Sequence, residues 1–139
     1  MYAWGRVLAS SKPEALMSVH EVAKKLVQFC KENKSLESIN TLYSPDIVSI
    51  EAGAPPGKER VTRGIEGVRG KHAWWTENHI VHSAEVQGPY PHGDDKFAVR
   101  FTYDITLKAA DKRFTMDEIA VFEVKDDKVV KEEFFYQMG

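Results

Sequence analysis

Two carboxylates stand on predicted strand faces that are otherwise apolar. Glu51 ends the β-branched run 47–51, and Glu118 interrupts the alternating apolar face of residues 114–124. Burying a charge is costly unless the group is paired, neutralised or used in chemistry. We therefore predict that Glu51 and Glu118 are catalytic, as a general base and a neutral general acid. The structural alternative places Glu51 in solvent at a strand end and gives Glu118 a hydrogen bond to a tyrosine or a tryptophan.

Further polar and aromatic side chains can line the same pocket. Tyrosine hydroxyls can donate to a developing oxyanion, although packing in the core with the hydroxyl at the rim is their commoner role. Glu132 is a third carboxyl that can separate the pKa values of the other two. An aromatic wall suits a flat, hydrophobic ligand. The predicted ligand-binding residues are Tyr43, His72, Trp75, Phe101, Tyr103, Met116, Glu132, Phe134 and Tyr136.

In the first half of the chain the spacing of apolar residues is typical of helices. The capping box from Ser18 to Glu21 begins a helix whose apolar stripe runs to Cys30. Ser35 is placed to cap a second, shorter helix, which Pro45 stops. A third helix covers 65–78. Its inner stripe carries Ile65, Val68, His72 and Trp75.

In the second half the apolar residues alternate, which is typical of strands. After a first strand at 47–51, the period of two predicts strands at 80–87, 96–107, 113–125 and 128–136. Helices followed by an antiparallel meander make an α+β domain. We predict a cone-shaped fold in which three N-terminal helices pack on a strongly curved, mainly antiparallel sheet with an internal pocket.

The sequence of the turn at 125–128 does not decide which face of the last strand lies on the same side as Glu118. A three-residue loop pairs Val124 with Lys128 and puts Glu132, Phe134 and Tyr136 on the face of Glu118. A two-residue turn brings Lys131, Glu133 and Phe135 there instead. A slip of one residue exchanges the two faces of a strand.

Composition limits the class of protein. The 139 residues make one domain at 17–139 with an N-terminal extension at 1–16, and Met17 is an alternative start of the protein. A net charge of −2 gives no reason to expect nucleic acid, and no apolar run is long enough for a membrane span. Cys30 is the only cysteine, which fits the cytoplasm. His79 and His82 lack a third ligand at a fixed spacing, so we predict no metal and no cofactor.

Three stretches carry a family resemblance. They are 42–51 (LYSPDIVSIE), 62–71 (TRGIEGVRGK) and 124–136 (VKDDKVVKEEFFY). In this order the chain resembles the nuclear-transport-factor-two-like superfamily, and within it the SnoaL-like branch that includes polyketide cyclases. In the ketosteroid isomerases of this superfamily the catalytic base lies eight positions after a tyrosine, as Glu51 does after Tyr43. No clear match to their oxyanion-hole pair is present, because Ala120 falls near the position of their protonated acid.

The resemblance implies a pocket inside the cone and a homodimer through the outer face of the sheet. We predict that the protein binds a small hydrophobic organic molecule, with cofactor-free acid/base catalysis of the isomerase, cyclase or dehydratase type. Glu51 takes the proton, and Glu118 or a tyrosine holds the oxyanion. The alternatives are a non-catalytic binding module, or an interaction domain that uses Ile119, Val121 and Phe135 on the outer face.

Overall fold

The computed structural model describes residues 18–137, so the predicted extension at 1–16 lies outside the described residues. The helices are α2 (Val19–Lys31), α3 (Ser35–Leu42), α4 (Ile65–Asn78) and the short 3-10 helix η1 (Lys108–Ala110). The strands are β1 (Tyr43–Ile50), β2 (Val61–Arg63), β3 (His79–His92), β4 (Lys96–Leu107), β5 (Lys112–Lys125) and β6 (Lys128–Phe135).

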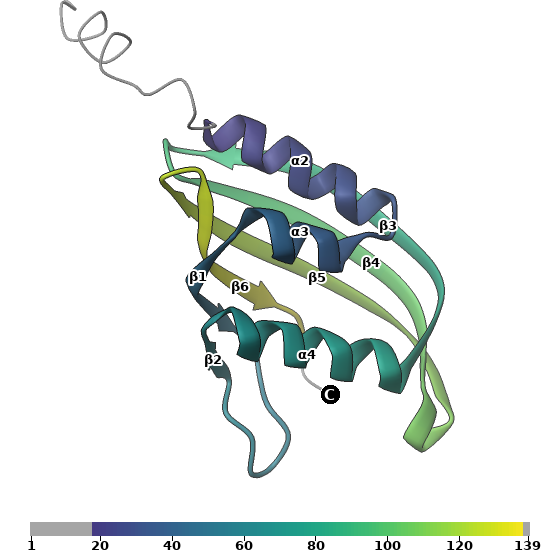
Figure 1. Ribbon diagram of the computed structural model, residues 1–139. Coiled ribbons are helices and arrows are strands. Elements are labelled where there is room, and N and C mark those ends of the chain that lie inside the picture. Colours follow the sequence, from purple (N-terminus) through teal and green to yellow (C-terminus); the bar gives the residue numbers. More distant parts are fainter. Residues whose placement is uncertain (1–17, 138–139) are drawn as a thin grey trace, which may run out of the picture.

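All six strands belong to one mixed sheet in the order β2-β1-β6-β5-β4-β3. The pair β1–β6 is parallel and the other neighbouring pairs are antiparallel. Figure 1 shows α2, α3 and α4 together on one side of this sheet. The predicted α+β class, with three helices on a mainly antiparallel sheet, is confirmed.

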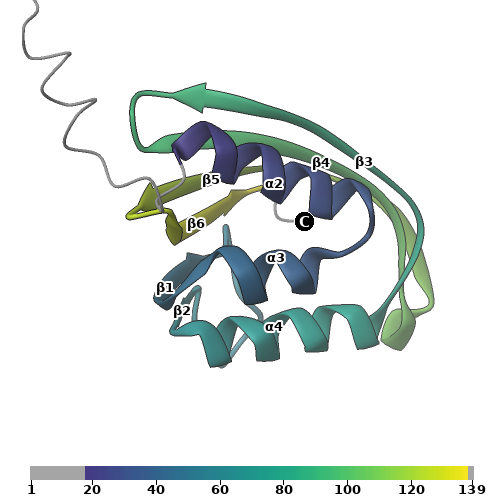
Figure 2. The same ribbon diagram turned by 45° about the horizontal axis from the view of Figure 1, so that its top comes forward.

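The sheet curls around the helices without closing. In Figure 2, β3, β4 and β5 arch over α2, and α4 runs beneath α3 from the β1–β2 edge toward the far ends of the long strands. The hydrophobic core fills the concave side and includes Leu26, Leu42, Ile47, Val68 and Phe97. Because apolar residues alternate along β4 and β5, each strand buries one face there and leaves the other uncovered.

Helix α2 begins where the sequence predicts. The Ser18 hydroxyl accepts from the backbone N–H of Glu21, and the Glu21 carboxylate accepts from the backbone N–H of Ser18, both at 3.2 Å. The prediction for Ser35 is wrong, because Lys34 is the cap of α3 and makes no side-chain capping bond. Ser35 is instead the first helical residue, and its hydroxyl lies 3.9 Å from the Cys30 sulfur.

Three strands differ from the predicted ones by more than one residue, and the first of them, β1, begins at Tyr43 rather than at 47. Strand β2 is a three-residue strand that the sequence pattern does not reveal, because it depends on pairing with β1. Strand β3 continues to His92, past its predicted end at 87, and Pro89 sits at a register shift between Gln87 and Tyr90. Proline is tolerated at such irregular positions since no ladder hydrogen bond is lost there.

A bulge decides which face of β6 meets the pocket. The turn has two residues, Asp126 and Asp127, both with positive φ, and Lys125 pairs with Lys128. Farther along, Phe122 pairs with Glu132, because Val130 is an extra residue on β6. The two-residue turn is therefore correct, but its predicted consequence is wrong. The bulge returns Glu132 to the inner face, as in the three-residue alternative.

Candidate functional site

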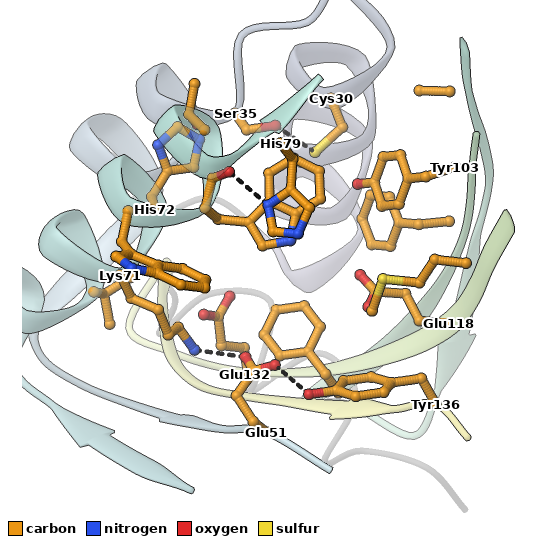
Figure 3. Close-up of a pocket in the computed structure, with 18 of the residues that line it drawn as sticks. Cys30, Ser35, Glu51, Lys71, His72, His79, Tyr103, Glu118, Glu132 and Tyr136 are labelled. Carbon is orange, nitrogen blue, oxygen red and sulfur yellow. Dashed lines mark hydrogen bonds and ion pairs between the residues drawn. The ribbon is translucent and has the colours of Figure 1, made fainter. Parts of the chain in front are cut away.

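One pocket on the concave side collects the predicted site residues. Both predicted catalytic carboxyls, Glu51 and Glu118, line it. So do all the predicted ligand-binding residues: Tyr43, His72, Trp75, Phe101, Tyr103, Met116, Glu132, Phe134 and Tyr136. Figure 3 shows Glu118 and Tyr103 projecting from the long strands on one side, with Lys71 and His72 from α4 facing them.

Glu51 lies in a compact polar network. Its Oε2 is 2.7 Å from the Lys71 ammonium, and its Oε1 accepts a hydrogen bond of 2.9 Å from the Tyr136 hydroxyl. The Glu51 and Lys71 side chains are each 27% exposed, so the pair is partly sheltered from water. The alternative in which Glu51 simply faces solvent is therefore wrong.

A second, fully buried carboxyl extends this network inward. Glu132 accepts hydrogen bonds from the Ser49 hydroxyl at 2.7 Å and from the Tyr43 hydroxyl, and Lys71 also donates to Ser49. Burial raises the pKa of Glu132, while the two hydroxyl donors lower it. Burial and the nearby Glu132 raise the pKa of the Tyr43 hydroxyl, so Tyr43 remains a donor.

Glu118 stands apart from these bonds. Among residues 18–137 its carboxyl has no hydrogen-bond or ion-pair partner, which contradicts the alternative of a bond to a tyrosine or a tryptophan. Burial, and then Glu51 and Glu132, raise the pKa of Glu118 to about 8, while Lys71 lowers it. A carboxyl in such surroundings changes its protonation state near neutral pH.

A row of aromatic rings forms the wall beside Glu118. Phe101 is its direct cross-strand partner on β4. The rings of Phe101 and Tyr103 stack with centroids 6.0 Å apart, and Trp75 lies 5.6 Å from Tyr103 and 4.4 Å from His79. Trp74 also lines the pocket but is 54% exposed, so of the two adjacent tryptophans Trp75 is the one that packs against Tyr103.

Comparison with known families decides where the chain belongs. The model of the SnoaL-like domain matches residues 17–136, which is nearly the whole chain. The chain belongs to the SnoaL-like family. The suggested superfamily and branch are thereby confirmed.

Solved structures resemble this SnoaL-like domain at several levels of identity. A Mesorhizobium loti protein named as a SnoaL-like polyketide cyclase and carbohydrate phosphatase is 40% identical, with a TM-score of 0.81 over 86% of this chain and 100% of that one. A Bacillus subtilis protein named as an isomerase is 17% identical, with a TM-score of 0.71 over 87% and 90%. An NTF2-like protein from Burkholderia thailandensis is 15% identical, with a TM-score of 0.72 over 88% and 92%. No curated protein matches the chain.

The histidines of this SnoaL-like domain occupy separate places. Burial lowers the pKa of His72 in the pocket. His79 bonds to the Trp75 carbonyl at 2.8 Å, whereas His82 bonds to Thr106 at 2.7 Å. Within 18–137, no three histidine, cysteine, aspartate or glutamate side chains come together as a metal-binding group. None of the helices in that range could cross a membrane.

Sequence reasoning missed two members of the site, Lys71 and Ser49. Lys71 lies three positions after the buried Val68, so the helical stripe carried a signal for it. Ser49 alternates with Ile47 on β1 and with Glu51 directly after it, so the spacing of two residues also predicted an inward side chain at Ser49. What neither pattern could give is the contact between them, which needs α4 to cross over β1.

Proposed function

We propose that this SnoaL-like domain binds a small hydrophobic organic molecule in its pocket and transfers a proton on it without a cofactor. The observation that carries the proposal is the set of contacts on Glu51. Inside an aromatic-walled pocket, one oxygen of this carboxylate faces an ammonium and the other a phenol. This arrangement supplies a proton acceptor and two proton donors within one small space.

The reaction class is proton transfer next to a carbonyl. Glu51 accepts a proton from the carbon beside the carbonyl, and the electron pair of that C–H bond moves to make an enolate oxygen. A protonated Glu51 no longer carries the charge that held Lys71 and Tyr136. Both donors then turn to the enolate oxygen, so they follow the negative charge as it moves. Return of the proton to another carbon gives isomerisation, and attack of the enolate on a second carbonyl gives cyclisation.

The sequence left the oxyanion to Glu118 or a tyrosine, and the geometry favours Tyr136. Its hydroxyl already donates to Glu51, so it lies beside the carboxylate that would take the proton. Burial, and then Glu51, raise the pKa of Tyr136, which keeps the proton on its hydroxyl. Glu118 shares no hydrogen bond with Glu51. The names of the Mesorhizobium and Bacillus relatives, a cyclase and an isomerase, fit this reaction class.

Hydrogen exchange on a probe ketone tests the proposal. In D₂O, the protein is expected to speed the uptake of deuterium at the α-carbon of 2-tetralone, followed by NMR. Glu51→Gln should slow this exchange about 100-fold, and Tyr136→Phe about 10-fold. Glu85→Gln, on the exposed outer face of β3, is the matched control and should leave the rate unchanged. A Glu51→Gln protein that exchanges as fast as the wild type would contradict the role of Glu51.

Binding without catalysis is the second candidate function. It is favoured by the fact that both oxygens of Glu51 already have partners within the protein. In that case the wild type binds 2-tetralone but does not speed its exchange, and its affinity survives Glu51→Gln.

We also propose that the protein is a cytoplasmic homodimer that assembles through the outer face of the sheet. Helices α2, α3 and α4 all lie on the concave side, so they leave this face uncovered (Figure 2). It carries the exposed apolar side chains Tyr90, Ile119 and Phe135, and Val121 pairs across the sheet with Ala98. Such a patch supports an interface. The single cysteine supports a reducing compartment.

A further inference from the structure

The partnerless carboxyl of Glu118 is the pocket group that the proposed reaction leaves unused. Both oxygens of Glu51 and both oxygens of Glu132 have hydrogen-bond partners, whereas Glu118 has none among residues 18–137. Lys71 is committed to Glu51 and Ser49. Lys71 therefore acts on Glu118 only from a distance, and a direct cationic partner for an ionised Glu118 is open to a ligand.

The surroundings of Glu118 suit an organic cation. Phe101 lies directly across the β4–β5 ladder, and Met116 and Ala120 are its neighbours on the same face of β5. Tyr103 stacks on Phe101, and Trp75 lies against Tyr103. Aromatic faces attract cations that lie within about 6 Å of the ring centroid, and tryptophan does so most strongly.

A metal ion fits this place poorly. Calcium takes six to eight oxygen ligands, and magnesium requires near-octahedral oxygen coordination. In the range 18–137 no third metal-ligating side chain joins any pair to form such a group. A single carboxyl with aromatic and thioether neighbours offers one ionic contact and a broad apolar surface, which is what an alkylated ammonium needs.

We propose that the pocket takes ligands that carry an ammonium group on a small apolar body, and that Glu118 and the aromatic rings of Trp75, Tyr103 and Phe101 bind this group. The inference rests on the proposed function only in that the ligand enters the same pocket. It deepens that function by naming the substrate class. The ammonium lies at Glu118, so that the rest of the molecule extends toward Glu51, Lys71 and Tyr136 (Figure 3).

Binding of the cation is coupled to loss of a proton. The pKa of Glu118 is about 8 in the free protein, so below that pH the ligand must displace a proton to form the ion pair. The apparent affinity for the cation should fall about tenfold for each pH unit below 8. The other titratable groups that line the pocket around Glu118 are Lys71 and His72 on α4, His79 at the start of β3, Glu51, Tyr103, Glu132, Tyr136 and Cys30.

These neighbours do not mask the effect. Burial raises the pKa of the Cys30 thiol to about 11 and raises that of Tyr103, so both stay neutral up to pH 9. Burial lowers the pKa of His72 from 6.5, so that histidine is neutral above that pH. Glu51 and Lys71 form an ion pair whose charges offset each other. Burial also raises the pKa of Glu132, but both oxygens of that carboxyl are bound by Tyr43 and Ser49. The Glu118→Gln variant therefore identifies the part of the pH dependence that belongs to Glu118.

A matched pair of probes tests the inference. Choline and 3,3-dimethylbutan-1-ol have nearly the same shape, but the second replaces the quaternary nitrogen with carbon. Calorimetry at pH 8.5 is expected to show choline binding at least tenfold more tightly than the alcohol. Glu118→Gln should remove that preference, whereas Glu85→Gln on the outer face of β3 should retain it. NMR should show choline shifting the indole N–H signal of Trp75.

The outcomes separate this inference from the proposed function. If the alcohol binds at least as tightly as choline, the pocket is an apolar site and the ammonium inference is overturned, while proton transfer by Glu51 still stands. If choline binds equally well to Glu118→Gln, or binding does not weaken between pH 8.5 and pH 6, the inference also fails. Loss of ketone exchange in Glu51→Gln with an intact preference for choline supports both proposals.

Discussion

The two faces of the β4–β5 ribbon carry the same kinds of residue and give them different properties. On the outer face Arg100 forms an exposed bidentate ion pair with Asp117, and Arg113 forms one with Asp104. Arg100 lowers the pKa of Asp117, and Arg113 lowers that of Asp104. On the inner face Glu118, the next residue along, has no such partner among residues 18–137, and its pKa rises to about 8. Adjacent acids on one strand thus differ in chemistry because water reaches only one of them freely.

The largest expected effect is a change in how stability depends on pH. The folded-state pKa of Glu118 is raised from 4.5 to about 8, so the wild type loses stability as the pH rises through that range. Glu118→Gln lacks this loss, and at pH 9 its free energy of unfolding should exceed that of the wild type by about 5 kcal/mol. Urea unfolding at pH 4.5 and pH 9 measures this.

Asp117→Asn is the matched control on the opposite face of β5. Its carboxyl titrates in the opposite sense, because Arg100 lowers its pKa. It should therefore cost stability above the ordinary aspartate pKa and not below it, with an effect that salt reduces. If the stability of Glu118→Gln depends on pH in the same way as that of Asp117→Asn, burial does not explain a difference in pKa between the two faces.

A smaller effect is expected from hydroxyl groups on the two faces. Tyr43→Phe removes one donor from the buried Glu132 and should cost about 2 kcal/mol. Thr102→Ala on the outer face removes a 3.5 Å contact with Asp117 and should leave the unfolding midpoint in urea unchanged. Equal losses for the two variants would mean that the inner network contributes no more than the outer one.

The third comparison concerns assembly. Val121→Asp places a charge in the proposed outer interface and should raise the dimer dissociation constant at least tenfold, as seen by sedimentation. Circular dichroism should show that the fold is kept, because Val121 lies outside the core cluster. A monomeric wild type would contradict the proposed homodimer directly.

The smallest effect is expected for the outer ion pairs alone. Arg113→Gln removes an exposed partner of Asp104 and should shift the unfolding midpoint slightly at low salt. At 1 M salt the shift should vanish, because such pairs are screened. A loss that persists at 1 M salt would show that this pair is more than a surface contact.

Local patterns predicted most of the fold. The capping box at Ser18 placed the start of α2, and the period of two placed β4 and β5 to within one residue. These features depend on neighbours in sequence, so the sequence shows them. Strand β2 was missed because three residues have no period of their own, and they become a strand only against β1.

The candidate site was predicted as a set of residues but not as a set of bonds. Charges on apolar faces pointed to Glu51 and Glu118, and their faces were right. Which carboxyl has partners could not be predicted, because Lys71 reaches Glu51 from a helix twenty positions later. Long-range contacts of this kind depend on how helices cross the sheet, which the local periods do not encode.

The bulge at Val130 has a consequence for comparing relatives. With it, β6 turns Glu132 and Phe134 inward, and a relative that lacks Val130 keeps this lining, because Lys131 then follows Val129 directly and still pairs with Glu123. A relative of the same length that pairs without the bulge turns Lys131, Glu133 and Phe135 inward instead, and the acid held by Tyr43 and Ser49 faces solvent. An alignment shows no gap in that second case, so two homologues can share nearly every residue of this strand and still offer different interiors to a ligand.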